Sequence, residues 1–125
     1  MIDLTNKLDF NSEKALNYLA TNGKIYTLRT QKNLSGLKAI FHNGQLEFNA
    51  DVTYEDRVEV YQTKTTLEFF YSPNLNKYVE RSGFNDAEEW LNECKKFHID
   101  FSHMRYLYLY LVHKKILIHV DMTKP

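Results

Sequence analysis

Apolar side chains recur along the chain with two periods, one typical of helices and one typical of strands. The helical period is clearest in residues 85–97, where five apolar residues share one helical face: Ala87, Trp90, Leu91, Cys94 and Phe97. This helix is predicted to begin at Asn85. Asp86 and Glu89 suit its positive end, and Glu88 is placed for a capping box. The continuous stripe predicts a helix that packs against a core.

Two further helices are predicted before it. The first runs from a cap at Asn11 or Ser12 to residue 22, and Gly23 supplies a C-terminal stop. The second is short, with Ser72 as its N-cap, Pro73 as its first helical residue and a stop at residue 83. Both are expected to bury one apolar face.

The other apolar stretches have the residue types and lengths of strands. The predicted strands cover residues 24–30, 37–42, 45–52, 57–62, 65–71, 106–112 and 116–120. Asn43-Gly44 is the strongest hairpin signal in the chain, and Thr63-Lys64 predicts a second turn without a glycine. Residues 113–115 are expected to turn the chain between the last two strands. In residues 106–112 tyrosine and leucine alternate, which is typical of a strand covered on both faces.

The order of these elements defines the expected fold class. Six or seven strands accompany two or three helices, and strands and helices do not alternate regularly as in βαβ units. A chain of 125 residues is long enough for one domain with a real core. We therefore predict a single α+β domain over residues 1–125, built on a strongly bent, mostly antiparallel sheet or small β-barrel.

Composition narrows the class of protein. Nine Tyr and eight Phe argue against intrinsic disorder. The single cysteine, Cys94, cannot form an intramolecular disulfide and fits a reducing compartment. Neither a transmembrane span nor a signal-peptide pattern is visible. These features predict a soluble, cytoplasmic protein without a membrane partner.

The distribution of charge leaves two interpretations open. The formal net charge is zero, yet residues 14–46 carry five cations and no acid. Acids concentrate in residues 47–68 and 80–93, and the C-terminal part is basic again. If the two basic segments meet in space, they form one cationic face that attracts nucleic acid. Otherwise the charges are evenly solvated.

One stretch carries most of the functional signal. Residues 22–30 read NGKIYTLRT and place Lys24, Thr27 and Arg29 in an otherwise apolar, β-prone run. The pattern resembles the K-x-x-T-x-R signature of the ASCH family, a branch of the PUA-like superfamily. Residues 82–90, which read SGFNDAEEW, and the strand ending at residues 109–112 resemble the later half of the same family. The resemblance spans roughly residues 12–112.

The resemblance implies a small β-barrel with flanking helices and an RNA-related function. Members of this family bind RNA, and one group deacetylates an N4-acetylated cytidine with a lysine, a threonine and a glutamate. By position, Lys24 matches the lysine and Thr27 the threonine, while Arg29 matches the motif arginine. Ser82 stands where the family usually has the glutamate, and the nearest acid is Glu80.

Three functional hypotheses follow. The first is binding of RNA or a nucleotide-like ligand, with cations on phosphates and one aromatic ring on a base; the predicted residues are Lys24, Tyr26, Arg29, Lys32 and Lys38. The second is an amidohydrolase acting on a modified nucleoside, with Thr27 as nucleophile, Lys24 as base and Glu80 as acid. Because residues three apart on a strand face opposite ways, that chemistry requires Lys24 to lie in a bend after Gly23. The third is a non-catalytic protein-interaction module.

A metal site is a further, weaker hypothesis for the Cys and His residues. Cys94, His98 and His103 have a spacing that a metal would accept, and His113 or His119 would complete the set. However, Cys94 lies on the apolar stripe of its helix, where a free cysteine usually packs. We expect neither a metal nor a cofactor, and the oligomeric state is left open.

Overall fold

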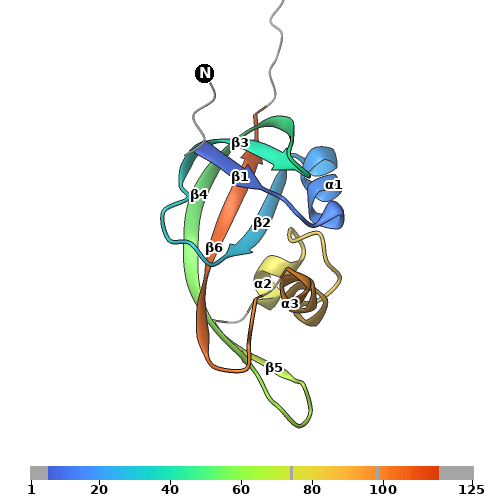
Figure 1. Ribbon diagram of the computed structural model, residues 1–125, viewed down its shortest axis with the longest axis vertical. Coiled ribbons are helices and arrows are strands. Elements are labelled where there is room, and N and C mark those ends of the chain that lie inside the picture. Colours follow the sequence, from blue (N-terminus) through green and yellow to red (C-terminus); the bar gives the residue numbers. More distant parts are fainter. Residues whose placement is uncertain (1–5, 74, 98, 116–125) are drawn as a thin grey trace, which may run out of the picture.

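The computed structural model describes residues 6–73, 75–97 and 99–115, and it has a mixed α+β architecture. Within these residues a six-stranded sheet is accompanied by three helices (Figure 1). The elements, in chain order, are β1 (Lys7–Asp9), α1 (Glu13–Asn22), β2 (Lys24–Arg29), β3 (Gly36–His42), β4 (Gln45–Gln62), β5 (Phe69–Ser72), α2 (Asn76–Val79), α3 (Ala87–Lys96) and β6 (Arg105–Lys114). No helix among the described residues is long and apolar enough to cross a membrane.

The sheet is mostly antiparallel and remains open. Its strand order is β1-β3-β4-β6-β2, and β5 pairs with the far part of β4. Only β1 and β3 run parallel among the paired strands of the described residues. The predicted α+β class is therefore confirmed. Closure into a barrel is not, because β1 and β2 are the two ends of the strand order.

Helix α1 begins and ends as predicted. The Ser12 hydroxyl accepts a hydrogen bond from the Ala15 N–H at 3.2 Å, which satisfies one of the free donors at the helix start. Gly23 follows the helix at φ +82°, a left-handed conformation that glycine adopts without steric cost, and its N–H bonds to the Leu19 carbonyl.

Helix α3 forms over the predicted stripe with a different capping partner. Asp86 is the N-cap, one residue later than predicted, and its side chain accepts from the Glu89 N–H at 2.7 Å. The Glu89 carboxylate in turn accepts from the Asn85 N–H at 3.3 Å. The prediction of Glu88 as the capping-box acid was wrong, because starting the count at Asp86 places Glu89 at the third helical position.

Several predicted boundaries also need correction. The two strands predicted at 45–52 and 57–62 form one continuous strand, β4, which absorbs the extra residue in a register shift between Tyr54 and Asp56. Ser72 ends β5 instead of capping a helix, and α2 begins only at Asn76. The turn predicted at residues 113–115 is replaced by the end of β6, which continues to Lys114. The strand predicted at 116–120 lies outside the described residues.

Two apolar cores cover the two faces of the sheet. Helix α1 packs on the first core, and α2 and α3 pack on the second. Strand β2 supplies Ile25 to the first core and Leu28 to the second. Strand β6 does the same, with Tyr110 and Val112 in the first core and Leu107 and Leu109 in the second. Alternation along β6 therefore reflects burial on both faces, as predicted, except near its exposed start at Tyr106.

Candidate functional site

A pocket opens where the C-terminal end of β2 meets the start of α1 and the middle of α3. Its volume is about 260 Å³. The residues that line it come from segments far apart in the sequence and include Phe10, Ser12, Thr27, Arg29, Phe84, Trp90, Glu93, Cys94 and Phe97. We call this cavity the β2 pocket. It combines one cation, one acid and several aromatic rings in a single small space.

Arg29 is held in a fixed position on one wall. Its Nε–H donates to the Thr27 hydroxyl at 3.1 Å, and its Nη1 donates to the Asp9 carbonyl. The guanidinium lies 4.6 Å from the centroid of the Phe10 ring, within the range of a cation–π contact. The contact with Asp9 connects the end of β2 to the end of β1, the first and last strands of the order β1-β3-β4-β6-β2. Burial lowers the pKa of Arg29 to about 10, so the group remains a cation at neutral pH.

Thr27 lies beside Arg29 on the same face of β2 and is only 8% exposed. Its hydroxyl accepts the bond from Arg29, and its strand partner across the sheet is Tyr110. The Tyr110 hydroxyl donates to the Gln31 carbonyl at 2.6 Å, which fixes the segment that follows β2. Thr27 and its neighbours thus form a rigid floor for the pocket.

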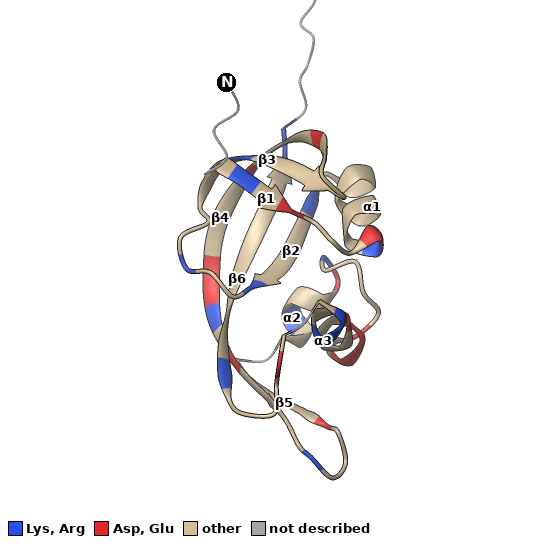
Figure 2. Ribbon diagram, viewed as in Figure 1, with Lys and Arg blue, Asp and Glu red and all other residues tan. Residues whose placement is uncertain are grey.

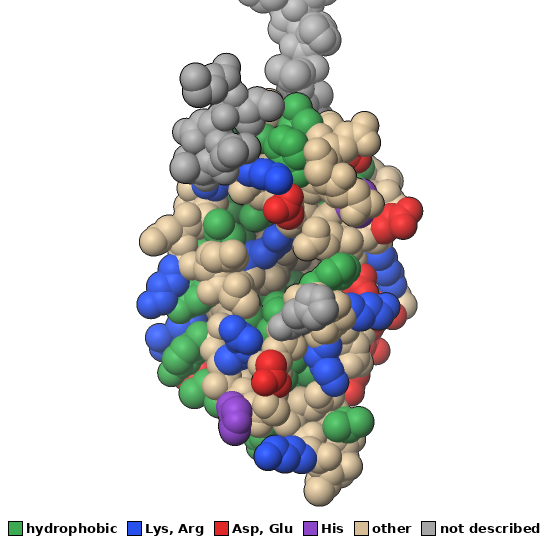
Figure 3. Space-filling model, viewed as in Figure 1, with side chains coloured by type: hydrophobic (Ala, Val, Ile, Leu, Met, Phe, Trp, Pro, Cys, Tyr) green, Lys and Arg blue, Asp and Glu red, His purple; other side chains and the backbone are tan. Residues whose placement is uncertain are grey.

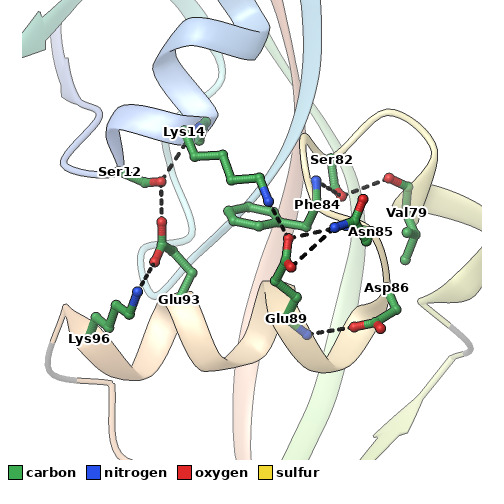
Figure 4. A network of polar contacts seen from close by, with 11 residues as sticks. Ser12, Lys14, Val79, Ser82, Phe84, Asn85, Asp86, Glu89, Glu93 and Lys96 are labelled. Carbon is green, nitrogen blue, oxygen red and sulfur yellow. Dashed lines mark hydrogen bonds and ion pairs between the residues drawn. The ribbon is translucent and has the colours of Figure 1, made fainter.

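The opposite wall is built by polar contacts between α1 and α3 (Figure 4). Glu93 accepts a hydrogen bond from the Ser12 hydroxyl at 2.5 Å and pairs with Lys96 at 3.1 Å. The Ser12 bond, followed by the Lys96 contact, lowers the pKa of Glu93 below its ordinary value, so it is a carboxylate at neutral pH. Lys14 of α1 also pairs with Glu89 of α3. The pocket therefore places a fixed anion opposite a fixed cation.

Cys94 lines the same pocket as these charged groups, and its thiol is not activated for reaction. Burial raises the pKa of its thiol to about 12, and the nearby Arg29 cation only partly opposes that effect. At neutral pH the side chain is a protonated thiol, which is neither a good nucleophile nor a good metal ligand. It contributes to the wall of the pocket as a packing residue.

The three residues proposed for catalysis are not brought together. Lys24 is the first residue of β2 and pairs with His113, so it projects to the face opposite Thr27. Glu80 follows α2, where its backbone carbonyl accepts from the Tyr18 hydroxyl. Neither Lys24 nor Glu80 lines the β2 pocket. Lys24 also does not lie in the bend after Gly23 that the hydrolase hypothesis required.

The residues proposed for nucleic-acid binding separate into different environments. Tyr26 packs edge-to-face on Tyr78, with ring centroids 4.9 Å apart, and burial raises its pKa. Lys38 is only 7% exposed, so its predicted place on a phosphate-binding surface is corrected. Lys32 is exposed and lies over the Tyr108 ring, outside the β2 pocket. Of the predicted binding residues, only Arg29 lines the β2 pocket.

Ser82, at the position where the ASCH resemblance expects a glutamate, has a structural role. It is fully buried, and its hydroxyl donates to the Val79 carbonyl at 2.7 Å. The same oxygen accepts from the Phe84 N–H at 3.1 Å. Ser82 thus fixes the turn that leads from α2 towards α3, and it does not line the β2 pocket.

Sequence reasoning missed the acid of the pocket. Glu93 and Ser12 are 81 residues apart, and only the packing of α1 on α3 brings them together. Ser12 was recognisable as a helix cap, but its second bond, to Glu93, had no sequence signal. His98 and His119 of the weighed metal set lie outside the described residues. Within residues 6–73, 75–97 and 99–115, three or more His, Cys, Asp or Glu residues do not gather as metal ligands would.

Comparison with known proteins identifies a viral relative. No family model matches the chain, and no solved structure matches it. The chain is 32% identical, over 97 residues, to Uncharacterized protein 105 of Sulfolobus islandicus rod-shaped virus 1. That similarity covers 76% of this chain and 81% of the viral protein, so it extends over most of both. The chain belongs to the same family as Uncharacterized protein 105 of this virus.

Proposed function

We propose that the chain is an ASCH-like domain of the PUA-like type that binds RNA or a nucleotide-like ligand in the β2 pocket. The observation that carries the proposal is the presence of Arg29 and Glu93 together in the lining of one small cavity with aromatic walls. The K-x-x-T-x-R pattern, which ends at Arg29, supports it independently. The proposed binding residues are Thr27, Arg29 and Glu93.

The polar groups of the pocket match the edge of a nucleobase. A base presents hydrogen-bond acceptors and donors side by side, and its flat faces stack on aromatic rings. Arg29 has five N–H donors, of which the contacts with described residues use two. Glu93 offers carboxylate oxygens as acceptors on the other wall. A pocket with one cation and one acid therefore suits a ligand that both accepts and donates hydrogen bonds.

The size of the pocket favours a small ligand. Ligand pockets commonly measure roughly 300–1,000 Å³, and the β2 pocket, at about 260 Å³, lies just below that range. Such a volume suits one base or nucleoside better than a large cofactor. The rings of Phe10, Phe84, Trp90 and Phe97 line the same space and supply apolar surface for the faces of a base.

The geometry favours binding over the amidohydrolase alternative. A threonine nucleophile needs a base within hydrogen-bonding reach of its hydroxyl. The hydroxyl of Thr27 instead accepts a bond from Arg29, and Lys24 lies on the other face of β2. Arg29 remains protonated at neutral pH because its pKa is about 10, so it does not act as that base. We therefore propose binding without hydrolysis.

The proposal is tested by titrating the folded protein with the four ribonucleosides, their 5′-monophosphates and a short single-stranded RNA. Binding is followed by calorimetry and by amide chemical shifts. Glu93→Gln is expected to weaken binding about tenfold, because it removes a charged hydrogen-bond acceptor. Glu88→Gln is the matched control: Glu88 is on the same helix, at an exposed position that does not line the pocket.

The two outcomes are easily separated. Shifts confined to residues around the β2 pocket, together with loss of affinity in Glu93→Gln alone, would support the proposal. Absence of binding by the folded wild type for every probe would refute it. Equal effects of Glu93→Gln and Glu88→Gln would refute the placement of the site.

A further inference from the structure

A second hollow lies outside the β2 pocket, on the surface formed by β4, β6 and the segment after β2. Its volume is about 340 Å³, and it is lined by Lys32, Tyr54, Arg57 and Tyr108. We call it the β4–β6 hollow. Neither the proposed nucleotide site nor the sequence signature accounts for the tyrosines and the arginine that it contains.

Strand register places the hollow on the same face of the sheet as the β2 pocket. Residues directly opposite each other on paired strands share a face. Two rows cross the three strands β2, β6 and β4. The threonine row consists of Thr27, Tyr110 and Tyr54, and the arginine row consists of Arg29, Tyr108 and Arg57. Each row starts in the β2 pocket and ends in the β4–β6 hollow.

The segment that follows β2 connects the two sites. Gln31 lines the β2 pocket, and its carbonyl is held by the Tyr110 hydroxyl at 2.6 Å. The next residue, Lys32, lines the hollow, with its ammonium 5.9 Å from the centroid of the Tyr108 ring. A ligand that fills both sites thus passes along this one segment.

The hollow has the chemistry of a stacking and phosphate-binding surface. The Tyr54 side chain is 46% exposed, and its ring lies 6.5 Å from that of Tyr108. Arg57 lies 4.5 Å from the Tyr106 ring centroid. In the described part of the chain, neither Lys32 nor Arg57 forms an ion pair with an acid. Exposed rings beside cations that lack an acidic partner are typical of proteins that bind single strands.

The surrounding charges define the extent of this surface. Asp56 pairs with Leu109 and therefore projects to the other face of β4. Glu59 shares the face of Arg57 but lies one step further along, opposite Tyr106. In Figure 2, the segment between β2 and β3 carries a cation close to a cationic position on β4. Figure 3 shows basic and hydrophobic side chains gathered together at the left edge of the molecule.

We infer that the β4–β6 hollow binds the nucleotide that adjoins the one in the β2 pocket. The ligand is then a single-stranded nucleic acid and not a free nucleoside. Lys32 and Arg57 contact phosphate, and Tyr54 stacks on a base. This inference rests on the proposed function, because it uses the β2 pocket as the neighbouring subsite.

The test compares two kinds of probe, a short single-stranded RNA and a free ribonucleoside, on the same variants. The double variant Lys32→Gln, Arg57→Gln removes both cations of the hollow. Its matched control is Lys64→Gln, Arg81→Gln, which removes one lysine and one arginine at exposed positions that do not line the hollow. Tyr54→Ala removes the stacking ring, and Tyr54→Phe keeps it.

The expected results follow from the two contacts. The Lys32→Gln, Arg57→Gln variant should bind RNA at least tenfold more weakly at low salt. The slope of its log affinity against log salt should be shallower by about 1.4, since each phosphate contact on a single strand contributes about 0.7. Tyr54→Ala should lose about tenfold, and Tyr54→Phe should not. Nucleoside affinity should remain unchanged in all four variants.

Three results would decide against one or both proposals. RNA affinity that is unchanged in Lys32→Gln, Arg57→Gln, while Glu93→Gln reduces it, would overturn the hollow and leave the β2 pocket intact. A loss of RNA affinity in the hollow variants, with no effect of Glu93→Gln and no nucleoside binding, would overturn the β2 pocket and support the hollow alone. If Lys32→Gln, Arg57→Gln and its matched control lose RNA affinity equally, the loss reflects the change in total charge and not a contact in the hollow, and the inference is overturned.

Discussion

Arg29 offers the sharpest test of whether the β2 pocket is built for a ligand or for stability. The informative change is Arg29→Met, which keeps an unbranched apolar stem but lacks the guanidinium and therefore also its cation–π contact with Phe10. It removes the charge and both hydrogen bonds, to the Asp9 carbonyl and to the Thr27 hydroxyl. If Arg29 mainly stabilises the fold, the free energy of unfolding should fall clearly. If it mainly serves a ligand, that free energy should change little.

The stabilising contacts of Arg29 and the cost of burying its charge are expected to be of similar size. A hydrogen bond from a charged group contributes about 1.5–3 kcal/mol, and the one to the Thr27 hydroxyl is expected near the lower end of that range. Against these gains stands the burial of the guanidinium, which lowers its pKa from 12.5 to about 10. At about 1.4 kcal/mol per pKa unit, that burial costs on the order of 3 kcal/mol. With the cation–π contact to Phe10 added, the gains match or modestly exceed the cost, so Arg29→Met should lower the free energy of unfolding by less than about 2 kcal/mol.

Arg29→Lys is the companion variant, and it should be the more damaging of the two. A lysine keeps a buried charge but cannot reach both the Asp9 carbonyl and the Thr27 hydroxyl with the geometry of a guanidinium. The cost of burial remains, while about half of the hydrogen bonding is lost. We expect Arg29→Lys to lower the free energy of unfolding by about 1–2 kcal/mol relative to Arg29→Met.

Urea unfolding followed by fluorescence of Trp90 measures both variants, and calorimetry with the RNA probe measures their affinity. Arg29→Met should stay within about 2 kcal/mol of the wild type in stability but bind at least tenfold more weakly. If Arg29→Met lowers the free energy of unfolding by more than about 2 kcal/mol, the contacts of Arg29 outweigh the cost of burying its charge, and Arg29 is a structural residue. A stability order with Arg29→Lys above Arg29→Met would refute the desolvation argument.

Three further predictions concern single positions. The pKa of Glu93 in the folded state is below its ordinary value of 4.5, so its contribution to stability is present above that pH and is lost as the pH falls through the lower, folded-state pKa. Glu93→Gln should therefore flatten this part of the acid-unfolding curve, and an unchanged curve would contradict the assignment. Because burial raises the pKa of Cys94 to about 12, a thiol reagent at neutral pH should modify the folded protein far more slowly than the protein unfolded in urea; equal rates would contradict this. Gly83 adopts φ +87°, and an added Cβ would lie 3.1 Å from the Tyr18 Cβ, whereas at Gly44 an added Cβ would meet open space. Gly83→Ala should therefore lower the free energy of unfolding by about 1–2 kcal/mol more than Gly44→Ala. Equal losses in urea unfolding would contradict the close contact at Gly83.

Local sequence signals predicted the elements whose stability depends on neighbouring residues. The apolar stripe of α3 and the glycine after α1 correspond to real helix boundaries, because periodicity and capping act within a few residues. The Asn43-Gly44 turn connects β3 to β4, with both residues at positive φ as a two-residue hairpin requires. These features needed no knowledge of the tertiary structure.

Elements that depend on distant partners could not be predicted in the same way. Strand β1 has only three residues and exists because it pairs with β3, so its own sequence carries no signal. The strand β4 looked interrupted near Glu55, and only its long pairing with β6 makes it continuous. The wall formed by Ser12 and Glu93 is likewise a product of tertiary packing. In the sequence, Lys24 is closer to Thr27 than Glu93 is, yet Glu93 shares the pocket with Thr27 and Lys24 does not.

The location of the site follows from how one face of the sheet changes along its strands. The row before the threonine row consists of Ile25, Val112 and Val52, which are all at most 3% exposed and belong to the first core. One step along, the threonine row introduces a hydroxyl and tyrosine rings, and the arginine row then places a cation on each side of Tyr108. A core that continued would need apolar residues at these positions, since a buried cation is costly. The first core thus ends at Tyr110, and the cationic and aromatic residues beyond it on three strands form the face on which we propose that a ligand binds across β2, β6 and β4.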